Sequence, residues 1–324
     1  MSLFVPILKE SGKLDEVHIT VCIVGSRKIT INDDYCSGGW VELAPNLTIY
    51  GFDADPDACE QANKDLAARQ VNWQEKHIPV ALNNSIGSYP LYVTNQIACT
   101  SLYPPNDSYL SRFQKIIPDS FQVDYTVEIE TTTLDEYCEQ QGIQEIDFLQ
   151  VDIQGADLHV LEGSSILLQR SILAIQTEVE FSHLYTNQPL FSDIDIFLRK
   201  NDFTLFDLVG CSRYPRARSP ICSPQRTGQL LWADAYYFRD LIREDISIQI
   251  KSPLQILKLA CIADILGFPD YTLELLEYLT VNYGDESKYN FANVIVKSLS
   301  QVPDLVERGL DSFAVVGNIR HRLN

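Results

Sequence analysis

Short apolar runs alternate with amphipathic runs along most of the chain, from about Val17 to Phe238. Apolar runs of about four to eight residues that are rich in Val, Ile and Tyr predict strands. Apolar residues spaced about three or four positions apart predict the helices between them. Because Ile146–Val151 and Ile172–Ile175 are short and largely apolar, they predict central strands covered by helices on both faces. The alternation therefore predicts an α/β fold with a doubly wound, mostly parallel sheet.

Capping and turn residues set the predicted boundaries. Pro56 precedes one helix, Thr133 and Glu136 form a capping box at the start of another, and Gly142 ends that second helix. The predicted strands are His18–Val24, Leu47–Phe52, Lys76–Leu82, Tyr89–Thr94, Tyr125–Glu130, Ile146–Val151, Ile172–Glu178, Thr204–Leu208 and Leu230–Phe238. The predicted helices between them are Asp57–Arg69, Leu134–Gln141, Ala156–Leu168 and Phe191–Lys200.

After Asp240 the pattern changes to helices alone. Pro253–Leu266 places its apolar residues on one stripe, and Thr272–Tyr283 and Lys288–Leu299 follow with turn residues between them. We therefore expect a domain formed by residues 1–240, followed by a helical C-terminal extension formed by residues 241–324.

The net charge of the chain disfavours some classes of binding partner. Lys and Arg number 25 against 44 Asp and Glu, which gives a formal net charge of −19. A surface this acidic repels phosphate backbones and anionic lipid, so we expect neither nucleic acid nor a membrane as partner. The eight cysteines show no Cys-x-x-Cys pair and no zinc-type spacing, and no apolar run approaches the ~20 residues of a membrane helix. These features predict a cytoplasmic protein without a metal site, and they leave a homo-oligomer open.

One basic segment stands out in the acidic chain. The loop between Gly210 and Thr227 holds Arg213, Arg216, Arg218 and Arg226. Guanidinium groups suit carboxylate or phosphate groups, so the loop is a candidate for recognising an anionic acceptor molecule. The alternative is that these arginines pair with surplus carboxylates of the chain itself.

Ligands of open α/β sheets bind beyond the carboxyl ends of the strands, so we looked for polar residues there. The strand Leu47–Phe52 is followed at once by Asp53 and then by Asp55 and a helix. The Asp53 carboxylate can accept hydrogen bonds from both hydroxyls of a ribose. The alternative is that Asp53 or Asp55 only caps the helix that follows.

A glycine-containing turn precedes Asp53 at a suitable distance. The segment Asp33–Gly39 places Asp33, Ser37, Gly38 and Gly39 about 20 residues before that carboxylate. It lacks the Gly-x-Gly-x-x-Gly fingerprint, which lowers the case for an oxidoreductase that binds a dinucleotide. Gly38 and Gly39 could also form a plain turn, and Gly25-Ser26 offers a competing turn at the end of the earlier strand.

Three further residues are candidates for catalysis. Asp152 is the first charged residue after the strand Ile146–Val151, and Glu178 and Glu180 alternate onto one face of the end of a later strand. Asp152 could deprotonate a hydroxyl or cap the next helix, and His183 could be a base or be merely exposed. Asp152 and Glu178 could together hold Mg²⁺, but no third ligand is evident, so we predict a base that works without metal.

Several segments together resemble the FkbM family of methyltransferases, which use S-adenosylmethionine. The match covers about residues 30–240. Its motifs are Tyr50–Pro56, Thr100–Asn106, Thr132–Tyr137, Ile146–Leu158, Val160–Gly163, Glu178–Phe181, Gln188–Phe191 and Phe203–Leu208.

This resemblance implies a Rossmann-like methyltransferase sheet of seven strands, the last two being Thr204–Leu208 and an antiparallel Leu230–Phe238. It implies that the Asp33–Gly39 turn binds the methionine part of the cofactor, Asp53 its ribose, and Ala81 lies near its adenine. Ser101 is a further candidate for cofactor contact. Tyr35 departs from the family, which usually carries glycine there.

The predicted function is S-adenosylmethionine-dependent transfer of a methyl group to a hydroxyl of a glycan or a glycosylated small molecule. Asp152 is the first choice for the group that takes the proton from the hydroxyl, followed by Glu178 and His183. The alternative function is a catalytically degenerate binding module with the same fold.

Overall fold

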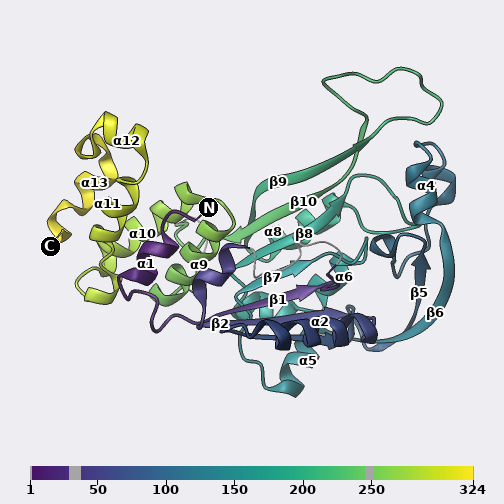
Figure 1. The fold of residues 1–324 in the computed structure, drawn as a ribbon, viewed down its shortest axis with the longest axis horizontal. Coiled ribbons are helices and arrows are strands. Elements are labelled where there is room, and N and C mark those ends of the chain that lie inside the picture. The colour runs from purple at the N-terminus through teal and green to yellow at the C-terminus, as the bar shows by residue number, and fades with distance from the viewer. Residues whose placement is uncertain (1, 29–37, 245–250, 324) are drawn as a thin grey trace.

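The computed structural model describes residues 2–28, 38–244 and 251–323, and its main feature is a seven-stranded sheet (Figure 1). In spatial order the strands are β3 (Gln74–Pro79), β2 (Leu47–Asp53), β1 (Ile19–Val24), β7 (Phe148–Val151), β8 (Ala174–Glu180), β10 (Gln229–Arg239) and β9 (Phe203–Tyr214). Strands β3, β2, β1, β7 and β8 are parallel, and β10 runs antiparallel between β8 and β9. The predicted doubly wound, mostly parallel sheet is confirmed.

Strands β9 and β10 continue beyond the sheet as a two-stranded ribbon. Their pairing runs from Phe203 with Arg239 to Tyr214 with Gln229, so both strands are longer than predicted. The predicted basic loop is shorter than expected, because residues 210–214 belong to β9. Residues 215–228 form the loop that joins the two strands, and it projects away from the body of the protein (Figure 1).

Two predicted strands lie outside the main sheet. They form β5 (Gly87–Thr94) and β6 (Val123–Thr132), which pair antiparallel in a small sheet whose third strand is β4 (Ala81–Leu82). The predicted strand Lys76–Leu82 is divided after Pro79, which has no N–H to donate to a sheet ladder. Most of β6 is exposed, and such a strand cannot occupy the centre of a covered sheet.

The helices between the strands begin at the predicted caps. Asp55 caps α2 by accepting hydrogen bonds from the N–H groups of Asp57 and Ala58, and Thr133 caps α5. The predicted helix Ala156–Leu168 is divided at Gly163, where the carbonyl oxygen of Asn83 would lie 2.3 Å from a Cβ. The helices are α2 (Pro56–Arg69), α3 (Asp107–Leu110), α4 (Ile116–Phe121), α5 (Leu134–Gln141), α6 (Asp157–Glu162), α7 (Ser165–Arg170) and α8 (Phe191–Lys200).

The two faces of the sheet are covered by helices from different parts of the chain. Residues of α5, α6, α7 and α8 share one apolar core with one face of the sheet. The opposite face shares a core with the first helix and the C-terminal helices, which are all on one side in Figure 1. These are α1 (Val5–Glu10), α9 (Pro253–Ile265), α10 (Pro269–Tyr283), α11 (Ala292–Leu299), α12 (Pro303–Arg308) and α13 (Ala314–Ile319).

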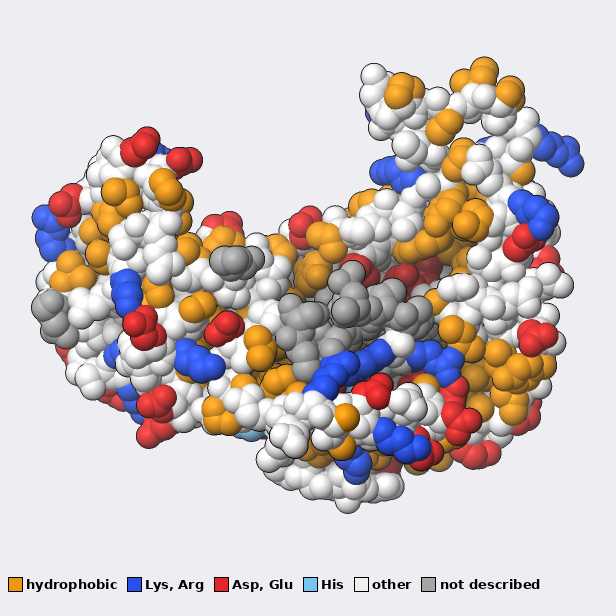
Figure 2. All heavy atoms as spheres, in the orientation of Figure 1, with side chains coloured by type: hydrophobic (Ala, Val, Ile, Leu, Met, Phe, Trp, Pro, Cys, Tyr) orange, Lys and Arg blue, Asp and Glu red, His pale blue; other side chains and the backbone are white. Residues whose placement is uncertain are grey.

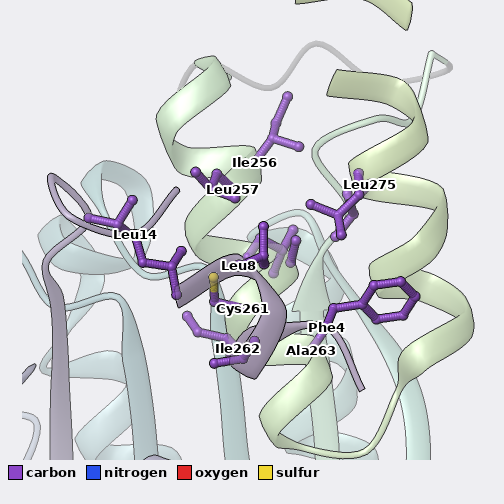
Figure 3. Close-up of a cluster of buried hydrophobic side chains, with 14 of the residues drawn as sticks. Phe4, Leu8, Leu14, Ile256, Leu257, Cys261, Ile262, Ala263 and Leu275 are labelled. Atoms are coloured by element: carbon purple, nitrogen blue, oxygen red, sulfur yellow. The ribbon is translucent and has the colours of Figure 1, made fainter. Parts of the chain in front are cut away.

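The first helix is held by the C-terminal helices. Phe4 and Leu8 of the α1 region pack among apolar side chains of α9 and α10, including Leu257 and Leu275 (Figure 3). The buried Asp264 carboxylate accepts hydrogen bonds from the N–H groups at residues 3, 4 and 5, at 2.8–2.9 Å. The C-terminal helices are thus part of the core that covers the sheet, and a domain boundary at residue 240 stays a prediction.

No helix in the described parts of the chain is long and apolar enough to cross a membrane.

Candidate active site

A large cavity lies beyond the carboxyl ends of β1, β2, β3, β7 and β8, where ligands of open α/β sheets bind. Its volume is about 1130 Å³, which is slightly above the roughly 300–1,000 Å³ range of small-molecule pockets. Figure 2 shows the hollow on one face of the molecule, with acidic side chains inside it and basic side chains along its rim. The cavity therefore has room for two small molecules at once.

The turn after β1 forms one wall of this cavity. Gly25 adopts a φ of 84°, and a Cβ there would lie 2.0 Å from the carbonyl oxygen of Asp152. Only glycine fits, because the ends of β1 and β7 approach each other closely. Sequence reasoning placed this wall on the later turn and missed Gly25–Lys28, although the turn signal of Gly25-Ser26 could have found it.

Part of the later turn also reaches the cavity. Gly38 and Gly39 line it where the 3-10 helix Gly39–Leu43 begins. Asp33 and Ser37, together with the departure at Tyr35, lie outside the described residues.

Asp53 lines the cavity at the end of β2, as predicted from the sequence. Its Oδ2 accepts a hydrogen bond from the Arg27 N–H at 3.1 Å, and its Oδ1 accepts one from the Asp55 N–H at 2.9 Å. Burial raises the pKa of Asp53, and the nearby Arg27 opposes that shift. Each carboxylate oxygen keeps a second acceptor site, so Asp53 can still bind the two hydroxyls of a ribose.

A buried row of polar side chains supports the same wall. Ser26 Oγ lies 3.0 Å from His77 Nδ1, and His77 Nε2 lies 3.1 Å from Glu75 Oε1. Gly51 makes room for this row, because a Cβ there would lie 2.6 Å from His77 Nδ1. Lys28 also donates to Glu75 at 3.2 Å, so the wall beside Asp53 is fixed by side chains that the sequence did not single out.

Asp152 lies at the end of β7 and lines the cavity. Gln154 Nε2 donates to Asp152 Oδ1 at 2.9 Å and to Glu178 Oε2 at 2.7 Å. The alternative role of Asp152 as a helix cap is not what the structure shows, since α6 begins at Asp157 after Ala156. Gln154 is therefore the residue that holds the two carboxylates side by side.

Gln154 is itself fixed by residues from other loops. Its backbone has a φ of 58°, and its side-chain Oε1 accepts a hydrogen bond from the Tyr185 hydroxyl at 3.0 Å. Ser101 Oγ donates to the Gln154 carbonyl oxygen at 2.6 Å. Ser101 lines the cavity, but this bond gives its hydroxyl a positioning role in the turn after β7.

More carboxylates gather at this end of the cavity, because β7 and β8 are neighbours and β10 adds another. Glu178 and Glu180 both line it from β8, and Asp234 lines it from β10. Burial, followed by the charge of Asp152, raises the pKa of Asp234 to about 6. Burial raises the pKa of Glu178 well above its usual value, and the charge of Asp152 adds to that shift.

Of the remaining predicted site residues, one lines the cavity and one does not. Ala81 lines the cavity from β4. His183 does not line it: its side chain is exposed, and its backbone carbonyl oxygen accepts a hydrogen bond from Asn106. We therefore remove His183 from the candidate catalytic residues. Among the described residues, no group of three or more His, Cys, Asp or Glu is placed to hold a metal ion.

The arginines of the projecting loop do not line the cavity either. Arg216 instead places its guanidinium group 4.5 Å from the centre of the Phe113 ring and bonds to Gln229. The geometry therefore gives these arginines no contact with the cavity.

The sequence profile of the methyltransferase FkbM domain matches residues 32–205, which is more than half of the chain. The chain belongs to the FkbM family of methyltransferases. Members of this family use S-adenosylmethionine. Membership therefore identifies S-adenosylmethionine as the methyl donor and methyl transfer as the class of reaction.

Two relatives illustrate the FkbM similarity. The chain is 24% identical over 197 residues to 2-O-methyltransferase NoeI of Sinorhizobium fredii, covering 58% of this chain and 73% of NoeI. It is 26% identical over 134 residues to methyltransferase sdnD of Sordaria araneosa, covering 37% of this chain and 52% of sdnD. The chain thus spans about half the length of sdnD.

Solved structures resemble the chain more weakly. A methyltransferase FkbM from Methylobacillus flagellatus has a TM-score of 0.39 and 10% identity over 69% of this chain and 44% of its own. The magnesium protoporphyrin IX methyltransferase of Synechocystis, solved with bound S-adenosylmethionine, has a TM-score of 0.33 and 12% identity over 73% of this chain and 76% of its own.

The residues of the cavity fit the cofactor of the FkbM family. Asp53 offers free acceptor sites for a ribose, and Gly25, Gly38 and Gly39 line the same cavity. The contact of each of these residues with S-adenosylmethionine stays a prediction.

Replacing Asp53 by alanine is expected to weaken binding of S-adenosylhomocysteine by about 1–3 kcal/mol, because charge-assisted hydrogen bonds are lost. Isothermal titration calorimetry of both proteins measures the difference. Asp65→Ala is the matched control, since Asp65 is exposed on α2 and does not line the cavity; it should keep the wild-type affinity. Equal affinities of the wild type and Asp53→Ala would remove Asp53 from the cofactor site.

Proposed function

We propose that this methyltransferase transfers the methyl group to a hydroxyl of a glycan or a glycosylated small molecule. The observation that carries the proposal is Asp152, a carboxylate exposed to the cavity at the end of β7 and held by Gln154. A carboxylate in this place can accept the proton of an acceptor hydroxyl. The similarity to NoeI, whose name describes 2-O-methyl transfer, supports the choice of oxygen.

The described residues would divide the work as follows. Bound S-adenosylmethionine supplies an electrophilic methyl group. Asp152 accepts the hydrogen bond of the acceptor hydroxyl and takes its proton as the oxygen reacts. Gln154 restrains Asp152, which keeps the acceptor oxygen in one orientation. Asp152 is preferred to Glu178 because Asp152 is the more exposed of the two and opens onto the cavity.

The experiment is a methyl-transfer assay with S-adenosylmethionine labelled in its methyl group and a panel of mono- and oligosaccharides. We expect labelled product, with the methyl group located on a sugar oxygen by NMR spectroscopy. His183→Ala should react at the wild-type rate, because His183 lies outside the cavity. Transfer only to nitrogen or carbon, or binding of glycans without any transfer, would contradict the proposal; the second result would favour the binding module.

A further inference from the structure

The acceptor end of the cavity holds a cluster of carboxylates. Asp152, Glu178, Glu180 and Asp234 all line it, and they come from three adjacent strands. Glu178 lies directly across from Asp234 in the pairing of β8 with β10. The buried Asp157 lies beneath them and adds its charge to theirs. The residues suited to the cofactor are at the other end, on the turns after β1 and β2.

One of these carboxylates has no hydrogen bond of normal geometry among the described residues, although the side chain of Gln188 lies near enough to lower its pKa. Glu180 is 1% exposed, and neither of its carboxylate oxygens has a hydrogen-bond partner among the described residues. The amide nitrogen of the buried Gln188 is also without one. A buried carboxylate without a partner is costly, so its presence in a cavity wall indicates that something from outside the protein completes it.

No described basic side chain bonds to Glu180. Arg27 and Lys28 are the Lys and Arg residues that line the described cavity, and they pair with Asp55 and Glu75 beside the cofactor wall. The residues outside the description, 1, 29–37, 245–250 and 324, include neither lysine nor arginine. A positive charge at this end of the cavity would therefore have to come with a ligand.

An aromatic side chain stands next to the unpartnered carboxylate. Trp232 lines the cavity and lies directly across from Glu180 in the pairing of β10 with β8. The ring of Trp232 is stacked on Tyr214 with a centroid distance of 5.2 Å, which fixes its orientation. An indole ring beside carboxylates is a combination that attracts ammonium groups.

We propose that the acceptor is a cationic molecule, an amine-bearing sugar whose protonated amino group binds at Glu180 between Glu178 and Trp232. The inference rests on the proposed function and adds the chemical class of the acceptor. A neutral sugar would give the cluster hydrogen bonds but would not relieve the repulsion among its acidic side chains. An ammonium group supplies both the positive charge and three N–H donors.

The test compares sugars that differ at one position: glucosamine, N-acetylglucosamine and glucose. Binding is measured by calorimetry on the full chain saturated with S-adenosylhomocysteine, at a pH that keeps the amine protonated. We expect glucosamine to bind at least about tenfold more tightly than the two neutral sugars. Glu180→Gln, which keeps the shape of the side chain, should abolish this preference while leaving the affinity for S-adenosylhomocysteine unchanged.

Glu128→Gln is the matched control, because Glu128 is exposed on β6 and does not line the cavity; it should keep the preference. Equal binding of the three sugars, binding of none, or a preference that survives Glu180→Gln would overturn the inference. The proposed function fails separately. If glucosamine binds through Glu180 but its nitrogen receives the methyl group, the amine site stands and transfer to oxygen is wrong. If neutral glycans are methylated on oxygen without any preference for the amine, transfer to oxygen stands and the amine site is wrong.

Discussion

Asp152→Asn is expected to slow methyl transfer by about 10²- to 10⁴-fold, the usual contribution of a general base. Asparagine keeps the size of the side chain and the Oδ1 that accepts from Gln154, but it cannot take a proton from the acceptor. The loss should therefore fall on kcat, with little change in the affinity for S-adenosylhomocysteine. Single-turnover rates and calorimetry on the same two proteins measure the two quantities.

Asp304→Asn provides the control for this substitution, since Asp304 is an exposed residue of α12 that does not line the cavity. It should retain the wild-type rate. If Asp152→Asn retained that rate as well, proton removal would have to be assigned to another group or to water. A large loss of cofactor affinity would instead give Asp152 a role on the cofactor side of the cavity.

Lys258→Ala is expected to lower the free energy of unfolding by about 3–5 kcal/mol, the range for breaking a buried ion pair. The Lys258 Nζ of α9 lies 2.9 Å from Asp147 Oδ1, and Asp147 also accepts a hydrogen bond from the Thr20 N–H. Burial raises the pKa of Asp147 even with Lys258 beside it, so the carboxylate left alone would be still less stable. Urea unfolding followed by circular dichroism measures the loss.

An exposed ion pair of the same kind gives the comparison. Lys297 of α11 contacts Glu10 of α1 at 2.7 Å with both side chains about half exposed or more, so Lys297→Ala should cost no more than about 1 kcal/mol. The double variant Lys258→Met with Asp147→Leu should recover most of the lost stability, because it removes both buried charges. A loss of less than about 1 kcal/mol for Lys258→Ala would show that the pair is not what joins α9 to the sheet.

The order of strands and helices could be predicted from the sequence because it depends on local pattern. Runs such as Ile172–Ile175 bury both faces, and caps such as Thr133 satisfy the first N–H groups of a helix, so both leave a signal in a few adjacent residues. The sequence pattern did not predict that β4, β5 and β6 form a small sheet of their own, apart from the main sheet. Which strands pair is decided by contacts far apart in the sequence.

The candidate site was predicted where one residue follows one strand, as with Asp53 and Asp152. Site residues were missed where their role depends on two segments, distant in the sequence, that lie close together in the fold. Gly25 is fixed by its distance to the Asp152 carbonyl, and Gln154 is placed by the Tyr185 hydroxyl. His183 was assigned to the site from its nearness in sequence to Glu180, but a loop can turn a side chain away within three residues.

The capping of α1 by Asp264 has a consequence for synthesis on the ribosome. The N–H groups at residues 3–5 cannot be satisfied in the native way until a carboxylate about 260 residues later has been translated. The apolar face of β1, with Val21 and Ile23, likewise waits for Leu257 and Ile262 of α9. The nascent chain thus carries an uncovered hydrophobic sheet through most of its translation, which exposes it to aggregation and makes it a natural client of chaperones. Final folding of the sheet is therefore expected only after α9 has left the ribosomal tunnel.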